Sequence, residues 1–251
     1  MKIAVITGAS SGLGTFFLEE VTKKYPELEE VWIIAEKGME KMEELSAAHK
    51  DVRVRPLLLD LSKESSFEEL DEFYRKEEAD IRLLVNNAGV ETVSSFAETP
   101  LQKLELMVHV NVRGVMMMDR ISIPYMKEGS AIVHTSSIYS FAPVPGDAVY
   151  AASKAFVRYL SIALHHELKK KGIRVLSLNP GSMKTALDRS DIRKGFSMPY
   201  LEMKEVAKQA LKYVEKGKAS LTLHPYYKAF AAFYKALPAS VSAKILGRKY
   251  L

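Results

Sequence analysis

The sequence predicts one α/β domain, a doubly wound parallel sheet of about seven strands with helices on both faces. Short apolar runs alternate with amphipathic stretches from the N-terminus to about residue 223, as strands and helices do in repeated βαβ units. Runs such as 81–85 are apolar almost throughout, which is typical of strands buried on both sides. With 251 residues, 47% of them hydrophobic, the chain can bury one large core.

The expected elements follow one another with short connections. We expect strands at 2–7, 31–35, 52–59, 81–85, 131–136, 173–178 and 219–223. We expect helices from the first glycine-rich stretch to about 24, and at 39–48, 62–78, 101 to about 120, 148 to about 171, and 204–216. Residues 182–199 follow a strand with no regular pattern and are expected to form a loop that covers a site.

The charge of the chain is unevenly distributed. Residues 226–251 carry five basic and no acidic side chains, and removing these five from the 36 basic residues leaves 31, equal to the 31 acidic ones. This distribution argues against a nucleic-acid surface spread over the fold. The absence of cysteine excludes disulfides and thiolate catalysis, and no 18-residue apolar span occurs. We therefore expect a cytoplasmic protein.

Two side chains four residues apart point to proton-transfer chemistry. Tyr150 and Lys154 lie in a segment of good helix formers, so both project from one helix face. A nearby ammonium favours the phenolate and lowers the pKa of a tyrosine, whose ordinary value is about 10. Ser137 ends a predicted strand, and the turn at 143–146 can fold the chain back towards Tyr150, so a hydroxyl and a phenol can share one substrate oxygen.

The spacing alone is not specific. Tyr200 and Lys204 form a second such pair, and about one is expected by chance in a chain with this composition. Ser137 precedes Tyr150 by thirteen positions, whereas the same offset from Tyr200 falls on Leu187. We therefore interpret only the first pair as functional.

Glycines at positions 8, 12 and 14 follow the first strand and precede a helix. Such a turn presents the free N–H groups of a helix N-terminus to a phosphate, which favours a dinucleotide as ligand. The spacing Gly-xxx-Gly-x-Gly meets the common dinucleotide fingerprint only approximately, and a plain turn is the alternative. A second turn, 86–89, follows the fourth strand with amides and small residues.

Together these motifs resemble those of the short-chain dehydrogenase/reductase family, over about residues 1–225. The matching residues are 7–14, Asp60, 86–89, Asn111, Ser137, Tyr150-xxx-Lys154, 179–181 and Thr185. The resemblance implies a single NAD(P)-binding Rossmann-fold domain over 1–225 and reversible hydride transfer between a nicotinamide and a carbonyl or alcohol. It also implies that residues 226–251, which lie outside it, form a separate tail.

The resemblance assigns roles to individual residues. It implies that the catalytic residues are Asn111, Ser137, Tyr150 and Lys154, with Asn111 holding a water that connects Lys154 to solvent. It implies a cofactor site formed by Gly8, Ser10, Ser11, Gly12, Leu13, Gly14, Glu36, Lys37, Asp60, Leu61, Asn87, Ala88, Gly89, Tyr150, Lys154, Pro180, Gly181, Met183 and Thr185. No metal is required.

Cofactor choice depends on the end of the second strand. Glu36 can accept hydrogen bonds from a free ribose 2′-hydroxyl, whereas Lys37 can pair with a 2′-phosphate. The glycine loop offers no second cation, so we favour NAD(H) while keeping NADP(H) open.

The expected substrate lining is largely apolar and comprises Val93, Ser137, Tyr139, Val144 and Tyr150, with Ser94, Phe96 and Phe141 nearby. It favours a hydrophobic secondary alcohol or ketone, for example alicyclic or steroid-like. The competing function class is a catalytically silent nicotinamide-binding sensor or scaffold, which would more readily have lost the catalytic side chains.

We expect a homodimer or homotetramer, by resemblance to the family. The basic, amphipathic tail carries an apolar stripe formed by Phe230, Phe233, Tyr234 and Leu237. It is expected to pack on the domain or on a partner, with weak contact to an anionic membrane surface as the alternative. His134 is expected to be a core residue.

Overall fold

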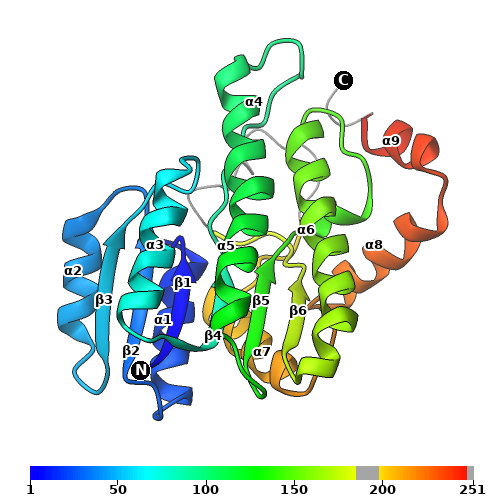
Figure 1. The fold of residues 1–251 in the computed structure, drawn as a ribbon. Coiled ribbons are helices and arrows are strands. Elements are labelled where there is room, and N and C mark those ends of the chain that lie inside the picture. The colour runs from blue at the N-terminus through cyan, green and yellow to red at the C-terminus, as the bar shows by residue number, and fades with distance from the viewer. Residues whose placement is uncertain (185–197, 248–251) are drawn as a thin grey trace.

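A seven-stranded parallel sheet forms the centre of the computed structural model, which describes residues 1–184 and 198–247 (Figure 1). The strand order is β3-β2-β1-β4-β5-β6-β7. The strands are β1 (Lys2–Thr7), β2 (Glu30–Ala35), β3 (Arg53–Leu58), β4 (Asp80–Asn86), β5 (Ala131–Thr135), β6 (Arg174–Leu178) and β7 (Ser220–Leu221). The order changes direction between β1 and β4, where open α/β sheets bind ligands at the carboxyl ends of their strands. The predicted fold class is confirmed.

Helices cover both faces of this sheet (Figure 1). They are α1 (Leu13–Lys24), α2 (Met39–Ala48), α3 (Ser65–Lys76), α4 (Leu101–Val108), α5 (Val115–Ser122), α6 (Ala148–Glu167), α7 (Met203–Glu215), α8 (Pro225–Ala236) and α9 (Ala239–Gly247). Short 3-10 turns occur at Ile123–Tyr125 (η2), Ile138–Phe141 (η3) and Leu168–Lys171 (η4).

Two predicted elements differ from those observed. The helix expected from 101 to about 120 is interrupted by a π-helical segment, η1 (His109–Gly114). The strand expected at 219–223 is reduced to the two residues of β7.

Separate apolar clusters fill the two faces of the sheet. On one face α1, α2 and α7 pack on the strands, with Phe17 fully buried. On the other face α3 and α5 do so, and Tyr74 stacks on Trp32 with ring centroids 5.6 Å apart. A side chain of this size contributes about 1.5–3 kcal/mol when it is fully buried. These clusters hold the strand ends in fixed positions, and the site is built on those ends.

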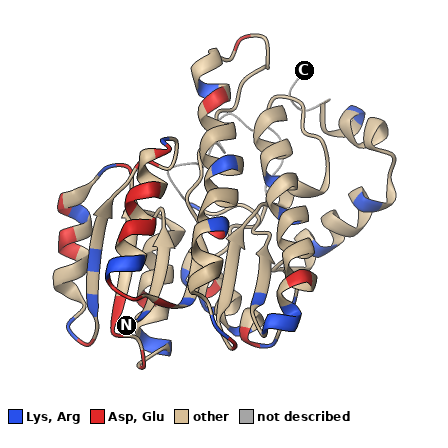
Figure 2. Ribbon diagram, viewed as in Figure 1, with Lys and Arg blue, Asp and Glu red and all other residues tan. Residues whose placement is uncertain are grey.

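The tail helices α8 and α9 lie beside α6 and carry basic but no acidic side chains among the described residues (Figure 2). Tyr227 and Ala231 are buried against η3, whereas Phe233 is 53% exposed. Part of the predicted stripe therefore faces outward, because periodicity marks apolar positions but not the direction from which a neighbour covers them. No described helix combines the length and apolar character needed to cross a membrane.

Candidate active site

The glycine turn after β1 brings two loops into contact. Gly8 and Gly12 adopt φ angles of 68° and 58°, in the left-handed region that favours glycine. A Cβ at Gly8 would lie 2.8 Å from the Cα of Ala88, and a Cβ at Gly14 would overlap the Gly8 carbonyl oxygen. Only glycine allows this backbone approach, which places the N-terminus of α1 beside the turn that follows β4.

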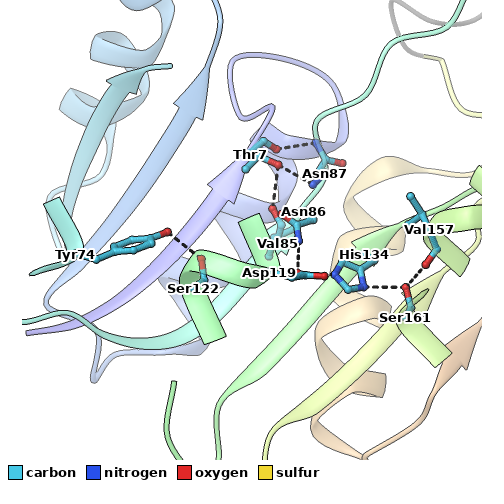
Figure 3. Close-up of polar contacts among 10 residues, drawn as sticks. All are labelled: Thr7, Tyr74, Val85, Asn86, Asn87, Asp119, Ser122, His134, Val157 and Ser161. Atoms are coloured by element: carbon cyan, nitrogen blue, oxygen red, sulfur yellow. Dashed lines mark hydrogen bonds and ion pairs between the residues drawn. The ribbon is translucent and has the colours of Figure 1, made fainter. Parts of the chain in front are cut away.

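Thr7 and Asn87 join the ends of β1 and β4 (Figure 3). Thr7 Oγ1 accepts hydrogen bonds from the N–H groups of Asn87 and Ala88, each at 3.0 Å. The Asn87 amide donates back to the carbonyl oxygens of Thr7 and Gly8 at 3.3 Å. These bonds fix two sequence-distant turns at one edge of the sheet.

Tyr150 and Lys154 lie one turn apart near the start of α6. The Lys154 side chain is buried, its Nζ donates to the carbonyl oxygen of Thr135 at 2.9 Å, and it lies 5.7 Å from the centroid of the Tyr150 ring. Burial lowers the pKa of Lys154 to about 8, although the charge of Glu91 opposes this change. The ammonium therefore remains mostly charged at neutral pH, close to the phenol.

Ser137 follows β5 and begins η3. Its Oγ accepts from the N–H of Tyr139 at 3.2 Å, which caps the turn. The Tyr139 ring meets the Tyr150 ring edge to face, with centroids 6.5 Å apart. The strand end, the 3-10 turn and α6 thus bring a hydroxyl and a phenol to the same cleft.

Asn111 lies in η1 and is fully buried. Its Oδ1 accepts from the Val90 N–H and its Nδ2 donates to the Val90 carbonyl oxygen, both at 2.8 Å. A Cβ at Gly89 would lie 3.1 Å from Lys154 Nζ and 3.3 Å from Asn111 Oδ1. Asn111 therefore fixes the segment after β4 directly beside Lys154, and its expected role in holding a water stays a prediction.

One cleft, with a volume of about 270 Å³, collects most of the predicted residues. Those that line it are Gly8, Ser10, Ser11, Gly12, Leu13, Asn87, Ala88, Gly89, Ser137, Tyr139, Tyr150, Lys154, Pro180, Gly181 and Met183. The glycine turn and the N-terminus of α1 line this cleft, and the free N–H groups of a helix N-terminus suit the phosphates of a dinucleotide.

Several predicted residues do not line this cleft. Glu36 and Lys37 are exposed at the end of β2, and Thr185 lies outside the described residues. Gly14 and Asn111 lie behind the lining, and Leu61 is buried under the helices. Val93 lies on the loop after β4, and Val144 is buried behind η3.

Asp60 also lies outside the lining, after β3. Its Oδ1 accepts from the N–H and the hydroxyl of Ser62 at 2.9 and 2.7 Å. Burial raises the pKa of Asp60, but these hydrogen bonds and the nearby Lys63 outweigh it, so the pKa is lowered overall. The carboxylate therefore stabilises its own turn, and its place in the cofactor site stays a prediction.

Residues that the sequence did not single out also line the cleft: Glu91, Thr135, Ser136, Ile138, Ser182 and Met198. Five of them lie within two residues of a predicted site residue, which was the available signal. Met198 falls within 182–199, the loop that the sequence predicted to cover a site. Neither Tyr200 nor Lys204 lines the cleft, in agreement with the interpretation of that pair.

The tail supports one wall of the cleft. The Tyr227 ring fills the space where a Cβ of Gly181 would lie. Tyr227 Oη accepts from the Ser182 N–H at 2.9 Å and donates to the Pro199 carbonyl oxygen at 2.7 Å. A residue of α8 thus fixes the segment from Gly181 to Ser182, which lines the cleft.

Known proteins share this architecture. The sequence model of the short chain dehydrogenase family matches residues 2–194. An uncharacterized oxidoreductase of Staphylococcus saprophyticus is 29% identical over 191 residues, which is 74% of this chain and 80% of that protein.

Two solved structures extend the comparison. A short-chain dehydrogenase of Sphingobium yanoikuyae in complex with NADPH is 25% identical, with a TM-score of 0.77, and the match covers 93% of this chain and 92% of that one. A 3-ketoacyl-(acyl-carrier-protein) reductase of Brucella melitensis complexed with NADH is 27% identical, with a TM-score of 0.75, and the match covers 88% and 96%. With the family match spanning β1 to beyond β6, the chain belongs to the short-chain dehydrogenase family.

Proposed function

We propose that this chain is a nicotinamide-dependent oxidoreductase that interconverts a hydrophobic secondary alcohol and its ketone, with Tyr150 as general acid and base. The observation that carries the proposal is that Tyr150, Lys154 and Ser137 line the same cleft as the glycine turn. Acid/base groups and a phosphate-binding turn are thus within reach of one bound dinucleotide and one substrate.

The nicotinamide supplies or accepts the hydride when the cofactor is bound. In reduction, Tyr150 donates its phenolic proton to the substrate oxygen as negative charge develops there, and in oxidation it removes the proton. The Lys154 ammonium stabilises the phenolate. The Ser137 hydroxyl donates a hydrogen bond to the same substrate oxygen and orients it.

The cofactor preference rests on Glu36 and Lys37. We favour NAD(H), because an exposed carboxylate after β2 accepts from a ribose 2′-hydroxyl and repels a 2′-phosphate. Lys37 keeps NADP(H) open, and the two solved relatives named above hold NADPH and NADH respectively.

The substrate class rests on the outer part of the cleft. Ile138, Tyr139, Met183 and Met198 give it apolar walls, which supports a hydrophobic alcohol or ketone. The homo-oligomer and the cytoplasmic location expected from the sequence remain proposals.

A sensor or scaffold that binds nicotinamide without turnover is the alternative, and a single substitution separates it from an enzyme. A panel of alicyclic and aromatic ketones is assayed with NADH and NADPH, for the wild type and for Tyr150→Phe. We expect a loss of about 10²–10⁴-fold in kcat/KM, because the general acid is gone. Cofactor affinity, measured by quenching of protein fluorescence, should change little.

Tyr200→Phe is the matched control, since Tyr200 lies outside the cleft. It should retain the wild-type rate. Equal rates for wild type and Tyr150→Phe would refute the proposed mechanism, and cofactor binding with no turnover of any ketone would favour the sensor.

A further inference from the structure

A second pocket, with a volume of about 420 Å³, lies between η3, α6 and the tail helices. It is lined by Ser140, Phe141, Pro143, Arg158, Tyr159, Tyr234, Lys235, Leu237, Ala239 and Ser242. None of these residues lines the catalytic cleft. The tail beyond α7 contributes half of the lining, so this pocket exists only because α8 and α9 pack beside α6.

Arg158 lines this pocket as a buried cation. It is 8% exposed and is the most buried arginine of the described chain. Arg174, in contrast, donates to the carbonyl oxygens of Glu215 and Gly129, and Arg55 pairs with Glu77 at 3.0 Å. Within the described ranges, 1–184 and 198–247, Arg158 forms no hydrogen bond or ion pair. Its Nε is buried without an acceptor.

A second cation lies nearby, and both cations contact the Phe141 ring. The Arg158 guanidinium lies 4.3 Å from the Phe141 ring centroid, and Lys235 Nζ lies 4.9 Å from the same ring. Partial burial and the charge of Arg158 both lower the pKa of Lys235. Cation–π contacts offset part of the cost of burying a guanidinium, but they leave its N–H groups without acceptors.

Two hydroxyl groups complete the polar surface. Ser140 Oγ and Ser242 Oγ are buried, and neither has a hydrogen-bond partner in the described structure. Among the described residues, no acidic side chain lines the pocket. A guanidinium, an ammonium and two serines thus line one pocket, and a ligand that pairs with both cations is an anion.

Aromatic and aliphatic side chains form the rest of the wall. Phe141, Tyr159 and Tyr234 present rings, and Pro143 and Leu237 add aliphatic surface. The volume is within the range of pockets for small organic molecules. An inorganic ion would satisfy the cations but leave these rings in contact with water, whereas an anion with an apolar body would cover both.

We propose that this pocket binds a small organic anion, in which a carboxylate or phosphate group pairs with Arg158 and an aromatic or aliphatic body packs between the rings. The site is separate from the catalytic cleft but adjoins it. Ser140 and Phe141 belong to η3, which begins next to Ser137, and Arg158 lies one helical turn beyond Lys154.

Calorimetric titration of the full chain at low ionic strength tests the proposal. Benzoate and phenyl phosphate are the anionic probes, and benzyl alcohol is the neutral probe of similar shape. We expect saturable binding of at least one anion and at least tenfold weaker binding of the alcohol. Comparison of the two anions shows whether carboxylate or phosphate is preferred.

Variants place the binding at this pocket. Arg158→Met should weaken anion binding at least tenfold, whereas Arg120→Met, at an exposed position of α5, should leave it unchanged. Lys235→Met, at an exposed position, and Ser242→Ala should each weaken anion binding several-fold. Neither variant replaces the buried Arg158, so both test the pocket even if Arg158→Met fails to fold. The anion should raise the melting temperature of the wild type but not that of Arg158→Met.

Three outcomes would overturn the proposal. The first is an absence of saturable binding for both anions. The second is equal binding of benzyl alcohol, which would show an apolar groove. The third is anion binding that survives all three pocket variants, which would place the anion in the dinucleotide cleft instead.

Discussion

Two polar clusters of this protein are built on the same two elements, β5 and α6. In the first, His134 of β5 and Ser161 of α6 meet Asp119 of α5 inside the core (Figure 3). In the second, the carbonyl oxygen of Thr135, the next residue of β5, accepts from Lys154, two turns earlier on α6. Neighbouring residues thus belong to a closed cluster, formed by Asp119, His134 and Ser161, and to an open cluster, in which Thr135 and Lys154 line a cleft.

The closed cluster resembles a hydrolase triad in its distances. His134 Nδ1 lies 2.8 Å from Ser161 Oγ, and Nε2 lies 2.9 Å from Asp119 Oδ1. However, all three residues are at most 4% exposed, and Ser161 Oγ donates to the Val157 carbonyl oxygen at 2.6 Å. No substrate can reach this serine, so the cluster holds α5 and α6 on the sheet.

The open cluster is no less buried at Lys154, which is 4% exposed, but its hydrogen-bonding capacity is not consumed by the protein. Of the three N–H groups on Nζ, one has an acceptor among the described residues, Thr135. Lys154 lines the cleft with Tyr150 and Ser137. Residue types and distances therefore do not make an active site, whereas access and unsatisfied donors do.

The largest expected effect is on the open cluster. Lys154→Met should lower kcat/KM by about 10²–10⁴-fold, because the phenol of Tyr150 loses the charge that favours its ionised form. Thermal stability should be kept or raised, since a buried ammonium is replaced by an apolar chain of similar length. Initial rates and thermal unfolding, measured on the same preparation, check both parts. A variant with wild-type rates would place the active site elsewhere.

The opposite pattern is expected for the closed cluster. Asp119→Ala removes the acceptor of hydrogen bonds from Asn86 Nδ2 and His134 Nε2, and leaves both donors buried. We expect the free energy of unfolding to fall by about 3–5 kcal/mol. The folded fraction at low temperature should keep its kcat within about twofold, because no member of the cluster lines the cleft.

Urea denaturation measures this loss of stability. Glu19→Gln is the control, since Glu19 forms an ion pair with Lys23 on the surface of α1 at 3.9 Å and should cost less than about 1 kcal/mol. If Asp119→Ala abolished turnover while leaving the protein stable, the closed cluster would have a role in catalysis.

The pH dependence of stability should distinguish the two clusters further, because Lys154 belongs to the open one. The folded-state pKa of Lys154, about 8, is below its ordinary 10.5 because of burial. Below pH 8 both states hold the proton, and the folded state carries the full cost of a buried charge. Between pH 8 and 10.5 only the unfolded state remains protonated, so this group makes the folded state more stable as the pH rises, by roughly 3 kcal/mol in total.

The rate should change in the opposite direction. Above pH 8 the neutral amine no longer favours the Tyr150 phenolate, so the contribution of Lys154 to kcat/KM is lost while stability improves. Urea denaturation of the wild type and Lys154→Met from pH 7 to 10 isolates the lysine. Parallel stability curves for the two proteins would show that Lys154 is not desolvated.

The sequence could predict features that depend on residues close together in the chain, but not those that depend on distant ones. The alternating pattern predicted the sheet, and local motifs predicted the glycine turn and the Tyr150 and Lys154 pair, because each depends on residues a few positions apart. The closed cluster joins Asp119, His134 and Ser161 from three elements, and Asn86 of a fourth donates to Asp119, so no local spacing indicates the contacts, although His134 was expected in the core. The π-helical η1 likewise depends on tertiary contacts of Asn111, not on a local signature.

Long-range packing also hid the role of the tail. Periodicity selected Phe233, which is exposed, and passed over Tyr227, whose position under Gly181 follows from a contact 46 residues apart in the chain. The effect of the tail on the cleft therefore follows from the structure and not from the sequence pattern.

The smallest expected effect comes from Tyr227, which combines features of the two clusters. Its hydroxyl is satisfied by the protein, yet its partners, Ser182 N–H and the Pro199 carbonyl oxygen, belong to the segments that form the cleft wall. Tyr227→Phe should lower the free energy of unfolding by about 1–3 kcal/mol, because two partly buried polar groups lose their partner. It should also raise the KM for the cofactor several-fold with little change in kcat, since the wall moves while Tyr150 does not. Tyr213→Phe, a partly buried tyrosine of α7, is the matched control and should leave both constants unchanged. A lower kcat with an unaltered KM would instead mean that the tail acts on the chemistry and not on the shape of the cleft.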